Sequence, residues 1–196
     1  MTDRILQTTD WAPNVILVDI DWIDKLVFDV SVNFERVLER RIPKMGLPDW
    51  ADYVSLDGGL RPGDNEVQVL LVYTKGHEWL HNCLPADLLG GFDGKAFKDR
   101  IGEFRFAVIP VEGEVIDKGE LMKQSLEALM SEERIKRLMV VGDLDSYGNQ
   151  LREAMDGGDK QTTLYVLEPQ TGFHCAQEML PYSVLAALGI RSEELK

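Results

Sequence analysis

The sequence predicts an α/β domain with a mostly parallel sheet of five strands. Short apolar runs alternate along the chain with segments whose apolar residues recur at the spacing of an amphipathic helix. Strands that are joined through helices run parallel and have both faces covered. The chain has 196 residues, 44% of them hydrophobic, which is enough for one compact domain with a full core. Together these observations indicate a single three-layer Rossmann-like domain.

The five predicted strands are apolar runs that end at acidic or turn-forming residues. In chain order they cover residues 14–21, 67–74, 103–111, 137–142 and 162–169. Each run is shorter than a typical helix and rich in Val, Leu or Ile, as expected for buried strands. The first and the fourth run end in an Asp-x-Asp pair, so acidic side chains directly follow two of the strands.

Helical spacing predicts helices over residues 28–42, 118–135, 147–155 and 182–189. Residues 75–102 are expected to form a broken helical crossover. The segment 48–66, rich in Gly, Pro and Asp, is expected to connect two elements and to hold a small strand at 53–56. We expect residues 1–13 to be a loosely attached segment and residues 14–196 to form the single domain.

The chain is strongly acidic, with 34 Asp and Glu against 21 Lys and Arg and a net charge of −13. This charge disfavours nonspecific binding to nucleic acid or to an anionic membrane, and DNA is not an expected partner. A divalent cation can nevertheless bridge acidic side chains to the phosphates of RNA.

The two cysteines, Cys83 and Cys175, are far apart in the sequence and have no ligand-spaced histidines nearby. Neither a zinc site nor a disulfide framework is therefore expected. No apolar run is long enough to span a membrane, and the first residues lack the features of a secretion signal. We expect a soluble cytoplasmic protein without a membrane partner.

Acidic side chains follow several predicted elements on one edge of the sheet. Asp19 and Asp21 come after the first strand, and Asp143 and Asp145 come after the fourth. Glu120 lies in the first turn of the helix before the fourth strand. The carboxyl ends of parallel strands meet at one edge, so these groups can converge. Carboxylates this close repel one another unless a hard cation lies among them, which predicts a Mg²⁺ or Mn²⁺ site.

The same acids have a purely structural alternative. Asp often caps the helix that follows a strand, and acidic residues in a first turn favour the helix dipole. After the fourth strand, Gly142 lets the backbone turn, so Asp145 or Ser146 is the expected cap of the next helix.

The order of elements and acids resembles that of the PIN-like nucleases, especially their NYN branch. In that branch an acid follows the first strand, a K-G-x-D segment opens the helix before the fourth strand, and S-G-D-x-D-F follows that strand. The segments DKGELMKQSLEAL (117–129) and VVGDLDSY (140–147) are similar to the last two motifs. Three differences are Val141 in place of Ser, Ser146 inserted before Tyr147 at the position of the Phe, and Glu120 in place of the Asp of the K-G-x-D segment.

This resemblance implies metal-dependent hydrolysis of phosphodiester bonds in RNA, with Mg²⁺ or Mn²⁺ as the cofactor. Asp19 and Asp143 would hold the metal, and Asp21, Glu120 and Asp145 would bind it directly or through water. The metal lowers the pKa of a bound water and stabilises the charge that develops on the phosphoryl oxygens. These five residues are the predicted catalytic and metal-binding set.

Two other metal-using families resemble parts of the chain. ILVDIDWI (16–23) is similar to the first motif of the haloacid dehalogenase phosphatases, which implies Asp19 as the nucleophile and Asp21 as a general acid. Thr74 would then hold the phosphate, and either Lys118 or Lys136 would be the required lysine. VEGEVID (111–117) and GDLDSYG (142–148) resemble the glutamate and D-x-D-x-x-G motifs of the Toprim fold.

A non-enzyme alternative explains the same acids as helix caps and solubilising groups. The chain would then be an acidic Rossmann-like module that binds a protein partner or forms a homodimer. The enzyme and module hypotheses differ in whether the side chains of Asp19, Glu120 and Asp143 lie within one metal-coordination sphere of each other.

Overall fold

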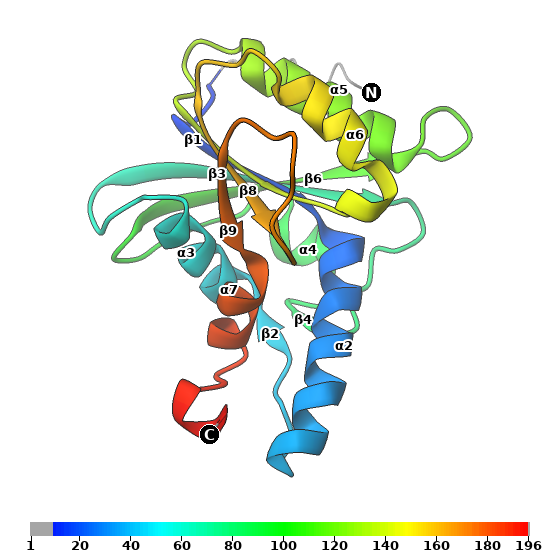
Figure 1. Cartoon of the computed structure of the whole chain (residues 1–196), viewed down its shortest axis with the longest axis vertical. Coiled ribbons are helices and arrows are strands. Elements are labelled where there is room, and N and C mark those ends of the chain that lie inside the picture. The colour runs from blue at the N-terminus through cyan, green and yellow to red at the C-terminus, as the bar shows by residue number, and fades with distance from the viewer. Residues whose placement is uncertain (1–9, 196) are drawn as a thin grey trace.

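The computed structural model describes residues 10–195 and shows an α/β fold around a seven-stranded sheet (Figure 1). Six strands run parallel in the order β6-β3-β1-β7-β8-β9, and β5 lies antiparallel beside β6 at one edge. The strands are β1 (Asn14–Asp19), β3 (Asn65–Thr74), β5 (Ala96–Lys98), β6 (Gly102–Val111), β7 (Arg137–Val141), β8 (Gln161–Val166) and β9 (Ala176–Met179).

The predicted α/β class with a mostly parallel sheet is confirmed, but the predicted number of five strands is wrong. The additional strands, β5 and β9, are short edge strands in which exposed residues alternate with partly buried ones. Neither contains an apolar run, so the sequence pattern that reveals buried strands does not reveal these two. A separate two-stranded ribbon pairs β2 (Met45–Gly46) with β4 (Cys83–Leu84).

Three of the four predicted helices begin earlier than the sequence pattern predicts, whereas the helix predicted from residue 118 begins there. The first starts at Ile20 instead of residue 28, because Asp19 caps it by accepting a hydrogen bond from the Trp22 N–H. The predicted strand at 53–56 is part of a helix that starts with Leu47 and a proline. The helices are α2 (Ile20–Leu38), α3 (Leu47–Asp57), α4 (Leu88–Phe92), α5 (Lys118–Ser131), α6 (Leu144–Met155), α7 (Leu180–Ala187) and the 3₁₀ turn η1 (Ser192–Leu195).

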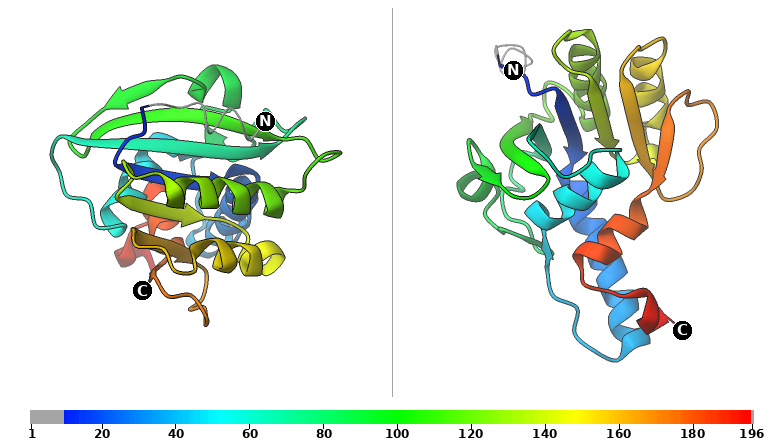
Figure 2. Two further views of the ribbon diagram at one scale, coloured as in Figure 1. Left: turned by 90° about the horizontal axis from the view of Figure 1, so that it is seen from above. Right: turned by 90° about the vertical axis from the view of Figure 1, so that its left-hand side faces the viewer.

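Helices cover both faces of the sheet and enclose two cores (Figure 2). Alternate residues of β1 point to opposite faces: Ile16 and Val18 pack with α2, α3 and α7, whereas Val15 and Leu17 pack with α5 and α6. This two-sided burial explains why the central strands are continuous apolar runs. The carboxyl edge of the sheet lies between the two helical layers.

The two ends of the described chain are tied to the domain. Trp11 and Ala12, in the predicted loose segment 1–13, are 7% and 0% exposed, and residues 1–9 of that segment lie outside the described residues. Near the other end, Arg40 pairs with Glu194 at 2.8 Å, which joins η1 to the residues after α2. Within residues 10–195, no helix is both long and apolar enough to cross a membrane.

Helix α3 meets the turn between β5 and β6 through two carboxyl groups, Asp52 and Asp99. Asp99 accepts hydrogen bonds from the N–H groups of Ile101 at 2.7 Å and Gly102 at 3.3 Å. Burial, the hydrogen bond to Asp99 and the negative charge of Asp99 together raise the pKa of the Asp52 carboxyl from 3.8 to about 7. The folded protein therefore keeps this proton over a pH range in which the unfolded chain has lost it.

We expect this carboxyl to make the fold less stable as the pH rises from about 4 to about 7, because only the folded state binds the proton there. Asp52→Asn keeps a neutral group, so it should be more stable than the parent at pH 8 by about 1 kcal/mol, a value reduced by solvent screening. Urea denaturation across this pH range measures the difference, which should be smallest near pH 4. Asp64→Asn, at a fully exposed carboxylate, is the control. Equal stability of parent and Asp52→Asn at pH 8 would contradict the prediction.

Candidate functional site

The carboxyl edge of the sheet is centred on Asp19, which is the last residue of β1 and the N-cap of α2. Its side chain is 5% exposed, and Oδ1 accepts a hydrogen bond from the Trp22 N–H at 3.2 Å. A buried carboxylate is costly unless its oxygens are hydrogen-bonded or ion-paired. Two side chains from other elements provide these partners.

Lys118, the first residue of α5, places its ammonium group between two carboxylates. Nζ lies 2.9 Å from Asp19 Oδ1 and 2.6 Å from Asp21 Oδ2. Asp21 Oδ2 also accepts a hydrogen bond from the Thr74 N–H, at the end of β3, at 2.7 Å. The Lys118 and Asp21 side chains are 18% and 21% exposed, so solvent screens these charges only in part. Two carboxylates and one ammonium leave one negative charge here.

Tyr147 joins Asp19 to the end of β7. Its hydroxyl donates to Asp19 Oδ2 at 2.7 Å and accepts from the Asp143 N–H at 3.0 Å. Helix α6 is kinked at this residue, whose φ of −141° and ψ of 24° are not helical. Burial and the negative charge of Asp19 raise the pKa of Tyr147 well above its ordinary value, so the hydroxyl remains a hydrogen-bond donor.

Two glycines make room for this tyrosine. A Cβ added at Gly142 would lie 2.7 Å from the Tyr147 hydroxyl oxygen, and one added at Gly119 would lie 2.7 Å from Tyr147 Cβ. Both distances are shorter than a normal van der Waals contact. The glycine after Lys118 and the glycine before Asp143 therefore allow the tyrosine to pack between α5 and β7.

The remaining predicted site residues make separate local contacts. Asp143 is the N-cap of α6, where Oδ1 accepts from the Ser146 N–H at 3.2 Å and Oδ2 from Ser146 Oγ at 2.6 Å. The prediction that Asp145 or Ser146 caps this helix is wrong, because the extended backbone of a cap occurs at Asp143. Glu120 accepts a hydrogen bond from Gln124 Nε2 at 2.8 Å, one turn further along α5.

The donor set does not fit the predicted Mg²⁺ or Mn²⁺ as the side chains are arranged. Within residues 10–195, no group of three or more His, Cys, Asp and Glu side chains could hold a metal ion. The Lys118 ammonium and the Tyr147 hydroxyl occupy the positions beside Asp19. Counted from Lys118, the acid of a K-G-x-D segment falls on Leu121, which is 3% exposed and lies in the core.

The structure also shows where the residues of the other two resemblances lie. The two segments that resemble the Toprim motifs follow β6 and β7, which are separated in the sheet by β3 and β1. Glu112 instead approaches Lys75 at 3.5 Å. Of the two lysines considered for a phosphatase, Lys118 reaches Asp19, whereas Lys136 Nζ donates to the Glu133 carbonyl oxygen at 2.6 Å.

Sequence reasoning identified Asp19 and Asp21 but not the partner that joins Asp19 to Asp143. The sequence indicates no role for Tyr147 beside these acids, and it offers Lys118 only as one of two possible lysines of a phosphatase. Gly119 and Gly142 are the sequence features that could have indicated this packing. Each lies next to a charged residue, and each leaves the room that the Tyr147 side chain needs.

Two cavities flank the first turn of α2. One, of ≈ 270 Å³, is lined by Asp21, by Asp24 and by five residues of the loop 75–82, which are Gly76, His77, Trp79, Leu80 and His81. The other, of ≈ 220 Å³, lies on the β7–β8 side, and its lining includes Trp22, Asp143, Asp145 and Glu168. Asp19 itself is covered by its hydrogen-bond partners. The acids that line the two cavities are instead Asp21 and Asp24 on one side and Asp143, Asp145 and Glu168 on the other.

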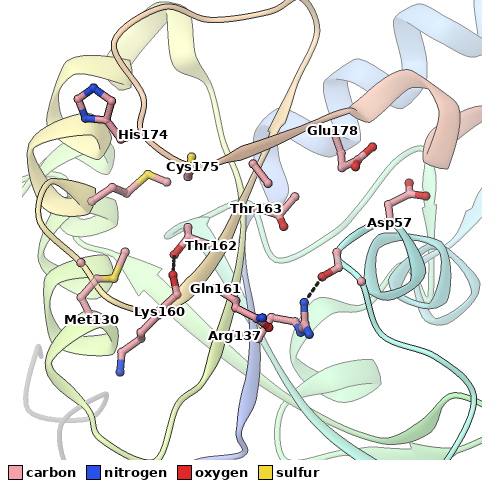
Figure 3. Close-up of a pocket in the computed structure, with 15 residues that line it drawn as sticks. Asp57, Met130, Arg137, Lys160, Gln161, Thr162, Thr163, His174, Cys175 and Glu178 are labelled. Atoms are coloured by element: carbon pink, nitrogen blue, oxygen red, sulfur yellow. Dashed lines mark hydrogen bonds between the residues drawn. The ribbon is translucent and has the colours of Figure 1, made fainter.

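A larger cavity of ≈ 460 Å³ lies at the opposite, amino edge of the sheet (Figure 3). Arg137, at its base, donates to the Gly58 carbonyl oxygen at the end of α3. Lys160 donates to the carbonyl oxygens of Glu132 and Ile135, at 2.7 and 2.9 Å, just after α5. These cations satisfy free carbonyl groups at helix ends. None of the predicted site residues lines this cavity.

Comparison with known proteins places the chain in a family. No curated protein and no solved structure matches it. A family model described as "Family of unknown function (DUF6621)" matches residues 8–195. The predicted membership of the PIN-like nucleases is wrong, because the match over this length is to that family and not to a PIN-like or NYN family. The chain therefore belongs to the family of unknown function DUF6621.

Proposed function

We propose that this chain is a non-catalytic protein-interaction module built on a Rossmann-like domain. The supporting observation is the closed network at the carboxyl edge, in which Lys118 lies between Asp19 and Asp21. Hydrolysis of a phosphate ester would need an accessible carboxylate or a cation held among several. In this chain the Lys118 ammonium and the Tyr147 hydroxyl occupy the space beside Asp19 where a substrate or a cation would bind. We therefore assign Asp19 and Asp21 a role in stabilising the fold.

The strand order supports the Rossmann-like part of the proposal. Numbered along the chain, the six parallel strands run 3-2-1-4-5-6 across the sheet, which is the order of doubly wound nucleotide-binding folds. The order reverses between β1 and β7, where such sheets have the crevice that receives a ligand. In this chain, the Tyr147 hydroxyl bridges Asp19 and Asp143 at that point.

The proposal is tested by assaying the chain on single-stranded RNA and on p-nitrophenyl phosphate, with millimolar Mg²⁺, Mn²⁺ or EDTA. We expect no turnover above that of Asp19→Asn, and no rise of the melting temperature in Mn²⁺, because the donor set is incomplete. Cleavage of RNA that depends on Mn²⁺ and is abolished by Asp143→Asn would overturn the proposal. Metal-dependent hydrolysis of RNA stays a prediction until that assay is done.

Phosphomonoester hydrolysis is the second candidate, because Lys118 and the Thr74 N–H both contact the Asp19–Asp21 pair. An Asp19 oxygen would attack phosphorus, and the alcohol would leave with a proton from Asp21. Water would then attack phosphorus of the aspartyl-phosphate and give a proton back to Asp21, which breaks the bond to Asp19, releases phosphate and restores both carboxyl groups. Hydrolysis of p-nitrophenyl phosphate that Asp19→Asn abolishes would favour this candidate over the module.

A further inference from the structure

The loop 75–82 is fixed against α2 and encloses a preformed cavity. Asp24 of α2 is 9% exposed and accepts hydrogen bonds from the N–H groups of His81 at 3.0 Å and Asn82 at 2.8 Å. The side-chain amide of Asn82 donates to the Asp24 carbonyl oxygen at 3.0 Å. The walls of the ≈ 270 Å³ cavity are therefore held by partly buried hydrogen bonds before any ligand arrives.

One wall of this cavity is Trp79, whose side chain is 61% exposed. Its backbone pairs with Asp87 in an antiparallel bridge, so an ordered main chain positions the indole. By contrast, Trp11 and Trp50 are 7% and 1% exposed. An exposed indole face attracts an organic cation through its quadrupole.

Asp21 gives the same cavity a negative charge with an available oxygen. Oδ2 accepts hydrogen bonds from Thr74 and Lys118. Oδ1 lies 3.9 Å from His77 Nδ1, which is too long for a hydrogen bond. The Asp19, Asp21 and Lys118 charges sum to one negative charge, so Oδ1 is an acceptor suited to a cation.

We propose that this cavity binds an arginine side chain from a basic segment of a partner protein. The inference rests on the proposed module function and names its partner class. A guanidinium group stacks on an indole and donates to a carboxylate at the same time. The second cavity, on the other side of the first turn of α2, adds Asp143, Asp145 and Glu168. The carboxyl edge of the sheet is therefore negatively charged on both sides of α2, which favours binding of a positively charged segment.

The experiment uses two fluorescein-labelled peptides of the same length, one with two arginines and the other with citrulline in their place. Citrulline keeps the planar side chain and removes its charge. Fluorescence anisotropy with the full chain measures both affinities in physiological salt. We expect the citrulline peptide to bind at least tenfold more weakly. Trp79→Ala should lower the affinity for the arginine peptide at least tenfold, because the exposed indole forms part of the binding site. The fold should be retained, because this side chain contributes little to the core.

Two controls separate this site from general attraction between acidic protein and basic peptide. Tyr182→Ala removes an aromatic side chain that is 71% exposed on α7, and Asp64→Asn removes a fully exposed charge. Neither variant should change the affinity by more than about twofold. Asp21→Asn should weaken binding of the arginine peptide, and circular dichroism of that variant verifies that the fold is retained.

Several outcomes would overturn the proposal. These are failure of the arginine peptide to bind, equal binding of the citrulline peptide, and equal binding by parent and Trp79→Ala. A concentration-dependent dimer that Trp79→Ala abolishes would instead assign the cavity to a second copy of the chain. If the arginine peptide does not bind but RNA and the monoester are not turned over, only the arginine proposal fails. Turnover of RNA or of the monoester would contradict the proposed module function itself, so the two failures are distinguishable.

Discussion

Lys118→Met is expected to lower the free energy of unfolding by about 3 kcal/mol, because it leaves two carboxylates without their cation. Asp19 is the main reason for this cost, since its side chain is 5% exposed and Lys118 Nζ lies 2.9 Å from Oδ1. Methionine has a similar length and is apolar, so the loss reflects mainly the charge and its hydrogen bonds. Urea denaturation of both proteins at neutral pH measures the difference.

Two further variants test whether this loss comes from the unpaired charge. In the background of Lys118→Met, Asp19→Asn removes the uncompensated charge and should restore about half of the lost stability. Lys123→Met is the matched control, because Lys123 belongs to the same helix and pairs with Glu153 at 2.8 Å on the surface. We expect little change from it. A loss for Lys118→Met no greater than that for Lys123→Met would show that the network does not stabilise the fold.

Tyr147→Phe is expected to lower the free energy of unfolding by about 2 kcal/mol. The change removes one hydroxyl, but this hydroxyl makes two hydrogen bonds, to Asp19 Oδ2 at 2.7 Å and from the Asp143 N–H at 3.0 Å. Asp19 loses a buried hydrogen bond and the Asp143 N–H a partly buried one, and the phenylalanine ring otherwise fills the same space. Thermal and urea unfolding of the variant measure the effect.

Tyr182→Phe is the control for this prediction, because it removes the same hydroxyl from a side chain that is 71% exposed. It should leave stability unchanged. If Tyr147→Phe and Tyr182→Phe behave alike, the phenol is not an essential bridge between β1 and β7. The closed network would then consist of Lys118 and the two carboxylates alone.

Much of the fold can be predicted from the sequence, because its central strands are buried on both faces. Strands β1, β3, β6, β7 and β8 all contain the apolar runs that two-sided burial requires. The edge strands β5 and β9 do not, because solvent on their exposed sides permits polar residues such as those of Ala176–Met179. The predicted start of the helix at 28–42 is late for another reason: Asp19 caps it directly from the strand.

The sequence by itself determined the α/β class, the mostly parallel sheet and the position of Asp19 and Asp21 at the carboxyl end of β1. These follow from the chain's own periodicity, since parallel strands joined by helices bring strand ends to one edge. Only the tertiary structure decided what lies beside those acids. Lys118 and Tyr147 come from helices about a hundred or more residues away, and their hydrogen bonds to Asp19 span 99 and 128 positions. Periodicity reports which face of an element is buried, but not which distant side chain fills the space next to a buried charge.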